Sequence, residues 1–215
     1  MPSPAIILSF LVGGMLLTAL LMVSRMRLAS LVGLFRIQAI LLGLYALDIA
    51  VRLNEVHLLI VAALVLILKA ILIPTLFLHI ARTTGASQRL EAYLRPTTLS
   101  FVGIVLVLGA FLAAQAALWG GTNYLIVGVS FSMVILGLLL LITRKDLFGQ
   151  GMGFLVMENG IFVFGLALTG GTPFFVEIGV MFDLLALFVL MMGLVRRVHG
   201  EYASLTTDYL RELID

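Results

Sequence analysis

Residues 56–80, VHLLIVAALVLILKAILIPTLFLHI, decide the fold class of this chain. The stretch contains a single Lys, Lys69 near its middle, and no Asp, Glu or Arg. An α-helix rises about 1.5 Å per residue, so about 20 apolar residues are needed to cross roughly 30 Å of hydrocarbon. The stretch is long enough for this crossing and too apolar for the surface of a soluble domain. It therefore predicts a transmembrane helix with a buried lysine.

The composition of the whole chain agrees with a membrane protein. Of its 215 residues, 62% are hydrophobic and 11% are charged, whereas a soluble domain carries about 25% charged residues. The net charge of +2 gives no reason to expect a nucleic acid partner. The absence of cysteine excludes disulfides, thiolate-held clusters and thiol nucleophiles from this chain, and its three histidines are too far apart for a zinc site. We predict no catalytic residue and no metal ligands here.

Six further apolar stretches are long enough to span a membrane. The seven predicted spans cover residues 4–24, 28–49, 56–80, 97–118, 123–143, 147–169 and 173–195. The ten-residue alternation typical of barrel strands does not occur, so the spans are predicted to be helices. The expected fold is an all-α polytopic membrane protein with about seven transmembrane helices. Residues 1–198 form one transmembrane domain, and residues 199–215 form a short cytoplasmic tail.

Basic residues mark every second connection between these spans. They are Arg25, Arg27, Arg82, Arg89, Arg95, Arg144, Lys145, Arg196 and Arg197. In the alternate connections the one basic residue is Arg52. Because cytoplasmic loops are enriched in Lys and Arg, we predict that the N-terminus lies outside and the C-terminus in the cytoplasm. The uncharged start Met1-Pro2-Ser3-Pro4 indicates that the first span is retained and is not a signal peptide.

Three ionisable residues lie deep inside predicted spans. Lys69, Glu158 and Asp183 are each about 11 or 12 residues from the cytoplasmic end of their span, which corresponds to roughly 16–18 Å of helix. Charges at mid-membrane are rare unless they pair or line a hydrated path. Since the three share one level, they can pair or exchange protons. The alternative is that Lys69 only neutralises one carboxylate and holds two helices together.

Glycine and proline positions near these charges predict close packing and a bend. Gly149, Gly151, Gly153 and Gly160 allow the backbone of the sixth span to approach a neighbouring helix. Pro74 lacks an N–H group, so it predicts a kink in the third span close to its lysine.

The two halves of the chain show a weak internal similarity. A basic loop, a glycine and a polar mid-helix residue recur as Arg25, Gly33 and Gln38 in the first half and as Arg144, Gly153 and Glu158 in the second. The spacings drift by a few residues, so a 3+1+3 duplication of helices stays open.

Several motifs resemble a known family. The runs LKAILIPTLF (68–77), GFLVMENGIFVFG (153–165) and VEIGVMFDLLALFVLMMGLVRR (176–197) resemble hydrogenase-4 component E. This family consists of membrane subunits of formate hydrogenlyase-type and related group 4 energy-converting hydrogenase complexes. Residues 123–196 are also similar to the K subunit of complex I and to the C subunit of Mrp antiporters. This similarity places Asp183 at the second of two central glutamates of the K subunit.

The resemblance implies roles for individual residues. Glu158 and Asp183 would be proton-relay carboxylates, and Lys69 would be a charge partner that tunes them. Three further residues, Arg36, Gln38 and Asn159, would orient these groups or hold water. Glu177, one turn into the seventh span, is a candidate outer port of the path or an interfacial carboxylate.

The resemblance also implies a setting for the chain. It would lie in the cell inner (plasma) membrane, in contact with lipid, and would join antiporter-like subunits to the membrane anchor of a hydrogenase module. A nickel-iron centre and iron-sulfur clusters would belong to those partners, with no cofactor in this chain. Energy conservation would then consist of redox-driven H⁺ or Na⁺ movement. A purely structural subunit and a stand-alone transporter are the two alternatives, and the sequence leaves the ion and the electron donor open.

Overall fold

The computed structural model describes residues 4–83, 88–118 and 124–169, and this part of the chain is all-α apart from isolated bridges in its loops. The helices are α1 (Pro4–Ser24), α2 (Leu28–Leu53), α3 (Val56–Val65), η1 (Leu66–Leu72), α4 (Ile73–Thr83), α5 (Pro96–Leu118), α6 (Tyr124–Thr143) and α7 (Leu147–Thr169). The element η1 is a π-helix, and it continues from α3 into α4 without a break.

Five helices are long and apolar enough to cross a membrane, which confirms a multi-pass membrane protein. They are Leu28–Leu53, Val56–Thr83, Pro96–Ala117, Tyr124–Thr143 and Leu147–Ala167, and Leu8–Ser24 is a shorter apolar helix. These six segments coincide with the first six predicted spans. The predicted seventh span (173–195), with Glu177 and Asp183, and the predicted tail (199–215) lie outside the described residues.

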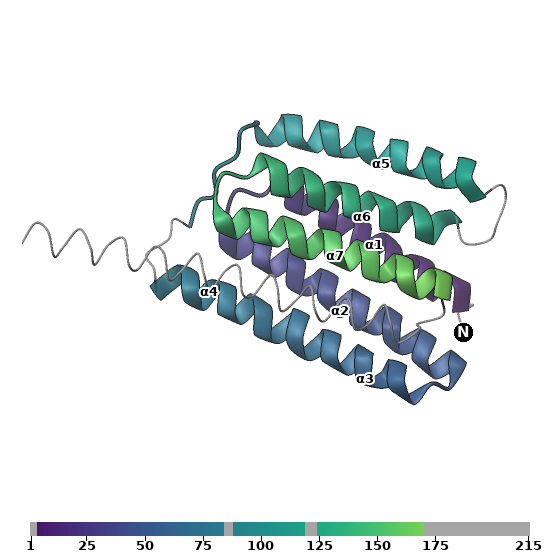
Figure 1. Cartoon of the computed structure of the whole chain (residues 1–215). Helices are drawn as coiled ribbons and strands as arrows, with labels where there is room; N and C mark the ends of the chain where they lie inside the picture. The colour runs from purple at the N-terminus through teal and green to yellow at the C-terminus, as the bar shows by residue number, and fades with distance from the viewer. Residues whose placement is uncertain (1–3, 84–87, 119–123, 170–215) are drawn as a thin grey trace, which may run out of the picture.

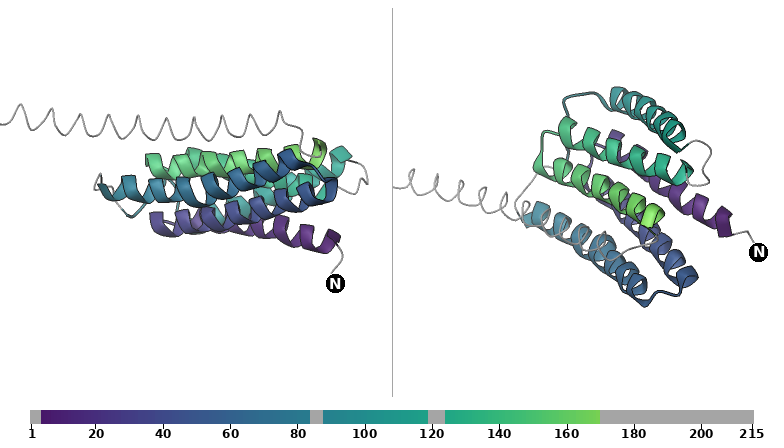
Figure 2. Two further views of the ribbon diagram at one scale, coloured as in Figure 1. Left: turned by 90° about the horizontal axis from the view of Figure 1, so that it is seen from below. Right: turned by 45° about the vertical axis from the view of Figure 1, so that its right-hand side comes forward.

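The helices lie side by side, with α5 at one edge and α3 and α4 at the other (Figures 1 and 2). Between these edges, α6 packs against α5, α1 and α7, and α7 also packs against α2. Helix α2 contacts α1, α3, η1, α4 and α7. Polar side chains on the inner faces of α2, η1 and α7 can therefore meet.

Glycines bring the backbones of α6 and α7 into direct contact, as the sequence predicted for the sixth span. A Cβ atom placed on Gly160 would lie 2.8 Å from the backbone nitrogen of Val134 and 2.9 Å from the carbonyl oxygen of Ser130. Cβ atoms on Gly137 and Gly153 would likewise meet backbone atoms of the facing helix. Only glycine allows this approach, so the position of α7 is tied closely to that of α6.

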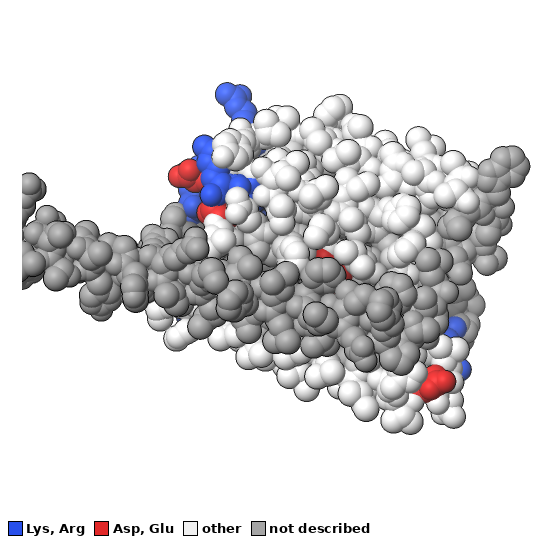
Figure 3. Space-filling view, in the orientation of Figure 1, with Lys and Arg blue, Asp and Glu red and all other residues white. Residues whose placement is uncertain are grey.

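The loops that carry basic residues gather at one end of the bundle (Figure 3). Residues 88–95 run between the other two loops: Leu28 N–H donates to the Gln88 carbonyl at 3.0 Å, and Tyr93 N–H donates to the Thr143 carbonyl at 3.0 Å. Isolated antiparallel bridges join Arg27 to Arg89 and Ala92 to Arg144. Residues 88–95 therefore link the two neighbouring loops to each other.

Arg144 fixes the same end of the bundle from inside. Its side chain is fully buried, and its Nη2 atom donates to the carbonyls of Val23 at 3.0 Å and Arg25 at 2.7 Å, with a longer bond of 3.3 Å to Met22. The last carbonyls of α1 have no partners within the helix and carry its partial negative charge, so a guanidinium stabilises them. Burial lowers the pKa of Arg144, and the nearby carboxylate of Asp146 opposes this shift.

Candidate functional site

Lys69, the single lysine in the stretch that decided the fold class, lies at the centre of the π-helix η1. In this segment the N–H of Ile73 bonds to the carbonyl of Leu68, five residues back. Pro74 follows immediately and cannot donate a backbone hydrogen bond. The hydroxyl of Thr75 donates to the carbonyls of Ile71 and Leu72, at 2.8 Å each. The predicted irregularity beside the lysine therefore takes the form of a wider helical turn, and such turns are frequent at functional sites.

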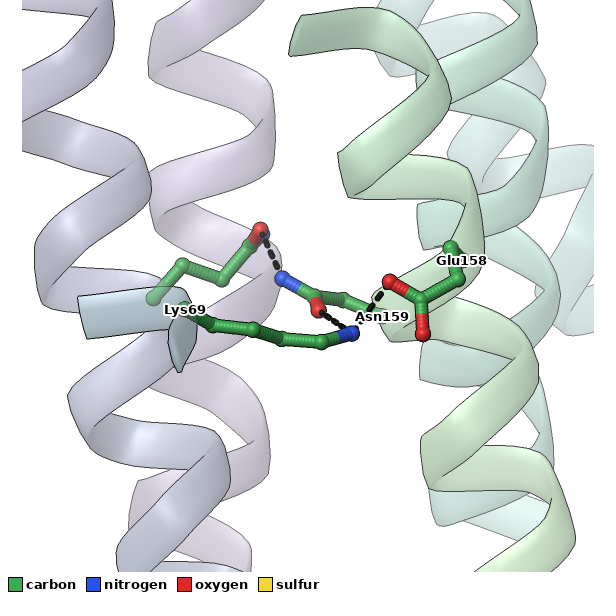
Figure 4. A network of polar contacts seen from close by, with 4 residues as sticks. Lys69, Glu158 and Asn159 are labelled. Atoms are coloured by element: carbon green, nitrogen blue, oxygen red, sulfur yellow. Dashed lines mark hydrogen bonds and ion pairs between the residues drawn. The ribbon is translucent and has the colours of Figure 1, made fainter. Parts of the chain in front are cut away.

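Lys69 and Glu158 form a buried ion pair between η1 and α7 (Figure 4). Each side chain is only 2% exposed. The Lys69 ammonium also donates to Asn159 Oδ1 at 3.0 Å and lies 5.8 Å from the centre of the Phe162 ring. The sequence placed two carboxylates at the level of the lysine and left its partner open. In the structure Glu158 is a partner of Lys69.

A chain of amide groups extends this pair across the bundle. Asn159 Nδ2 donates to Gln38 Oε1 on α2 at 3.1 Å, and Gln38 Nε2 donates to the carbonyl of Met15 on α1 at 3.1 Å. Both amide side chains are fully buried. The same carbonyl accepts a hydrogen bond of 2.7 Å from the Thr18 hydroxyl. The polar chain therefore links η1, α7, α2 and α1 at one level.

Other predicted site residues are not part of this chain of contacts. Arg36 is half-buried and lies two positions before Gln38, which places it about 200° away around α2. Its Nε atom is buried without a hydrogen-bond partner among the described residues. Asp48 and Arg52 form a partly exposed ion pair of 2.8 Å near the opposite end of α2.

The sequence did not point to the residues of α1. This helix has no charged side chain, and Thr18 bonds to a carbonyl three residues back, as threonines in helices often do. Its participation depends on the contact between α1 and α2, which periodicity alone could not reveal.

The arrangement supports charge pairing and proton exchange as its chemistry. Within residues 4–83, 88–118 and 124–169, no group of three or more His, Cys, Asp or Glu side chains could hold a metal ion. Glu158 is a carboxylate that can accept a proton, and Lys69 supplies the positive charge that stabilises its ionised form.

Comparison with known proteins shows which proteins the chain resembles. No family model matches the sequence, and no solved structure matches it. The chain is 30% identical over 214 residues to the uncharacterized protein Rv0085 of Mycobacterium tuberculosis, covering 98% of this chain and 97% of the relative. It is 25% identical over 211 residues to hydrogenase-4 component E of Escherichia coli K12, covering 97% and 98% of the two chains. The protein of the same name in Shigella flexneri matches to the same extent. On these matches the chain is a homologue of hydrogenase-4 component E, and the motifs around Lys69 and Glu158 agree with this relation.

Proposed function

We propose that this chain is a membrane subunit of a hydrogenase or complex I-like oxidoreductase, and that it contributes to H⁺ or Na⁺ translocation coupled to the redox chemistry of partner subunits. Homology to hydrogenase-4 component E supports the assignment to such a complex. The observation that carries the ion-translocation role is the buried ion pair between Lys69 and Glu158.

The depth of the pair supports this role. Glu158 lies at the midpoint of α7, about 16 Å along the helix axis from either end. A charge at this depth costs about 2.5–3.5 kcal/mol on insertion scales, and such residues usually mark ion or proton pathways. Glu158 can take up H⁺, or its carboxylate can bind Na⁺ in competition with the lysine. Either event changes the net charge of the pair. Neighbouring charged groups respond to this change, so binding of an ion at Glu158 can be coupled to them.

The chain would work as one part of a larger membrane complex. Antiporter-like subunits and the membrane anchor of a hydrogenase module would be its partners, with the nickel-iron centre and iron-sulfur clusters held by the redox subunits. Asp183 would extend the relay from Glu158, Glu177 would be its outer port, and Arg36 would hold water beside it. The basic end of the bundle would face the cytoplasm of a cell whose inner membrane holds the complex, with the N-terminus outside.

Substitution of the buried carboxylate tests the proposal. Glu158→Gln keeps the shape of the side chain and removes its charge, so we expect the complex to assemble and turn over substrate while redox-coupled ion movement falls at least tenfold. The measurement is ion uptake by inverted membrane vesicles alongside the redox rate. Glu91→Gln, a change of an exposed carboxylate in the loop of residues 88–95, is the matched control. Wild-type ion movement in both Glu158→Gln and Asp183→Asn would contradict the proposal.

A structural role is the second candidate, and the amide chain to α1 favours it because that chain binds four segments together. In that case Lys69→Met would prevent assembly of the complex. The charge-exchanged pair Lys69→Glu with Glu158→Lys would restore assembly and leave ion movement at the wild-type level. Restored assembly without ion movement would favour translocation instead.

A further inference from the structure

The polar chain from Lys69 to α1 has a fixed direction. The Lys69 ammonium can only donate hydrogen bonds, and the Met15 carbonyl can only accept them. Between these two ends, Asn159 accepts from Lys69 and donates to Gln38, and Gln38 donates to Met15. Every amide oxygen in the chain therefore faces toward the lysine, and every amide nitrogen faces toward α1.

Turning either amide group over, so that its oxygen and nitrogen change places, breaks these hydrogen bonds. If Asn159 turned over alone, its NH₂ group would face the Lys69 ammonium, and its oxygen would face the oxygen of Gln38. If Gln38 also turned over, its oxygen would face the carbonyl oxygen of Met15. Both amides are completely buried, so an unsatisfied contact of this kind would cost about 1–3 kcal/mol. The two ends of the chain thus determine the orientation of both amides.

This orientation has a consequence for the lysine. An amide oxygen held toward Nζ interacts about twice as strongly with an ammonium as with a neutral amine. Transfer of a proton from Lys69 to Glu158 would weaken that contact and leave an amine facing the oxygen of Asn159. Proton uptake by Glu158 from outside the pair keeps the contact intact.

We infer that Gln38 is a positioning residue that acts through Asn159 to keep Lys69 in its ammonium form, so that proton exchange in the pair takes place on Glu158. In the exchange step the Glu158 carboxylate forms an O–H bond with a proton released by hydronium, which becomes water. The pair changes from neutral to singly positive, and Lys69 is unchanged. The inference rests on the proposed function only for the use of this step in transport.

The surrounding helices carry other ionisable groups. Among the described residues of α1 to α4, α6 and α7 these are Arg36, Tyr45, Asp48, Arg52, His57, His79, Arg82 and Tyr124. Helix α1 carries none, and Arg36 lies on a different side of α2 from Gln38. Asp183, outside the described residues, is a further carboxylate predicted at this level.

The chain is well suited to a direct test, because it contains only two lysines, Lys69 and Lys145. With ¹⁵N-labelled lysine in the full chain in liposomes, solid-state NMR distinguishes ammonium from amine nitrogens, and Lys145→Arg assigns the two signals. We expect Lys69 to stay an ammonium over the pH range in which Glu158 gains its proton. The protonation of Glu158 is followed by the infrared carboxyl band that Glu158→Gln removes.

Substitution of Gln38 tests its positioning role. In Gln38→Met the amide of Asn159 keeps its contact with Lys69 but loses the contact that orients it from α2. The ratio of ammonium to amine signal from Lys69, compared at one pH, should therefore fall about tenfold relative to the wild type. Gln115→Met, the same change at an exposed position of α5, should cause no change in this ratio. Gln38→Glu keeps an oxygen for Asn159, and as the protonated acid it still donates an O–H bond to the Met15 carbonyl, so it should hold Lys69 charged at least as well as the wild type.

Two results would overturn the inference: an amine signal from Lys69 in the wild type while Glu158 is still ionised, or equal behaviour of Gln38→Met and Gln115→Met. If Gln38→Met does not fold, Gln38→Glu decides, because early loss of its ammonium signal contradicts the inference. These titrations do not depend on ion movement. Full ion movement in both Glu158→Gln and Asp183→Asn would therefore reject the proposed function and leave this inference standing.

Discussion

The described part of the molecule buries two cations, and they are satisfied in different ways. Lys69, at mid-bundle, is 2% exposed and faces the carboxylate of Glu158 and the amide oxygen of Asn159. Arg144, at the basic end, is fully buried and donates mainly to carbonyl oxygens at the end of α1. Carbonyl groups do not titrate, whereas a carboxylate can lose its charge by taking up a proton. The surroundings of Arg144 are therefore constant, and those of Lys69 can change.

This difference separates a structural cation from a functional one more clearly than burial does. Burial alone would rank Arg144 above Lys69 as a site residue. The guanidinium has five donors in a fixed planar arrangement, which suits several fixed acceptors, while the ammonium is a compact charge that suits one carboxylate. We therefore assign stability to the contacts of Arg144 and ion exchange to the pair of Lys69 and Glu158.

The largest expected effect on stability is that of Arg144→Leu. The change removes the guanidinium from the carbonyls of Met22, Val23 and Arg25, although Met22 keeps its bond from the Arg25 N–H. We therefore expect the free energy of unfolding to fall by about 3–5 kcal/mol. Because the guanidinium stays charged at all ordinary pH values, this loss should not vary with pH. Unfolding in mixed micelles measures it, with Lys145→Leu, an exposed neighbour, as the control that should lose less than about 1 kcal/mol. A strongly pH-dependent loss would remove the contrast between the two cations.

Lys69→Met should have the next largest effect, and this effect should depend on pH. The change leaves Glu158 buried without its ammonium partner, so we expect a loss of about 3 kcal/mol near neutral pH. A protonated carboxyl needs no counter-charge, so the loss should shrink as the pH falls. The same unfolding assay at several pH values measures it.

The double variant Lys69→Met with Glu158→Gln is the control for this effect. It should recover most of the lost stability and show little pH dependence, because neither side chain is then charged. Equal losses in the single and double variants would mean that the pair does not interact energetically.

The sequence predicted the role of Lys69 much better than that of Arg144. Lys69 and Glu158 stand out because each interrupts a long apolar run at the same depth, so periodicity and length were enough to single them out. Their pairing could not be predicted, since Asp183 has the same depth. The structural role of Arg144 was missed because the enrichment of cytoplasmic loops in Lys and Arg already explained a basic residue there.

The contacts of the amide chain were also beyond the sequence. Gln38 and Asn159 were singled out as polar residues near the central charges, but their direct hydrogen bond depends on the packing of α2 against α7. Pro74 predicted a bend near Lys69, and the structure has the π-helix η1 at this place. The choice between a kink and a wider turn depends on contacts with neighbouring helices, which a single sequence does not record.

A smaller effect is expected from Gly160→Ala, next to Asn159. The added Cβ would lie 2.8 Å from the backbone nitrogen of Val134, and the backbone of α6 cannot move aside without separating the helices. We expect a loss of about 2 kcal/mol in stability and lower ion movement, because α7 and its Glu158 shift together. Gly109→Ala, where no atom lies within 4 Å of the new Cβ, should leave both unchanged or raise stability slightly. Wild-type values for Gly160→Ala would show that the α6 contact does not position the pair.

Gly149→Ala makes the corresponding change beside the other cation and should have the smallest effect. Its Cβ would lie 2.8 Å from Cγ and 3.0 Å from Cβ of Arg144, so the side chain of Arg144 must move, whereas at Gly160 the clash is with helix backbone. We therefore expect a loss of about 1 kcal/mol in the unfolding assay, with no change in ion movement relative to redox turnover. Loss of ion movement in a stable Gly149→Ala protein would mean that the contacts of Arg144 also serve transport, and the division between a constant and a changeable cation would then fail.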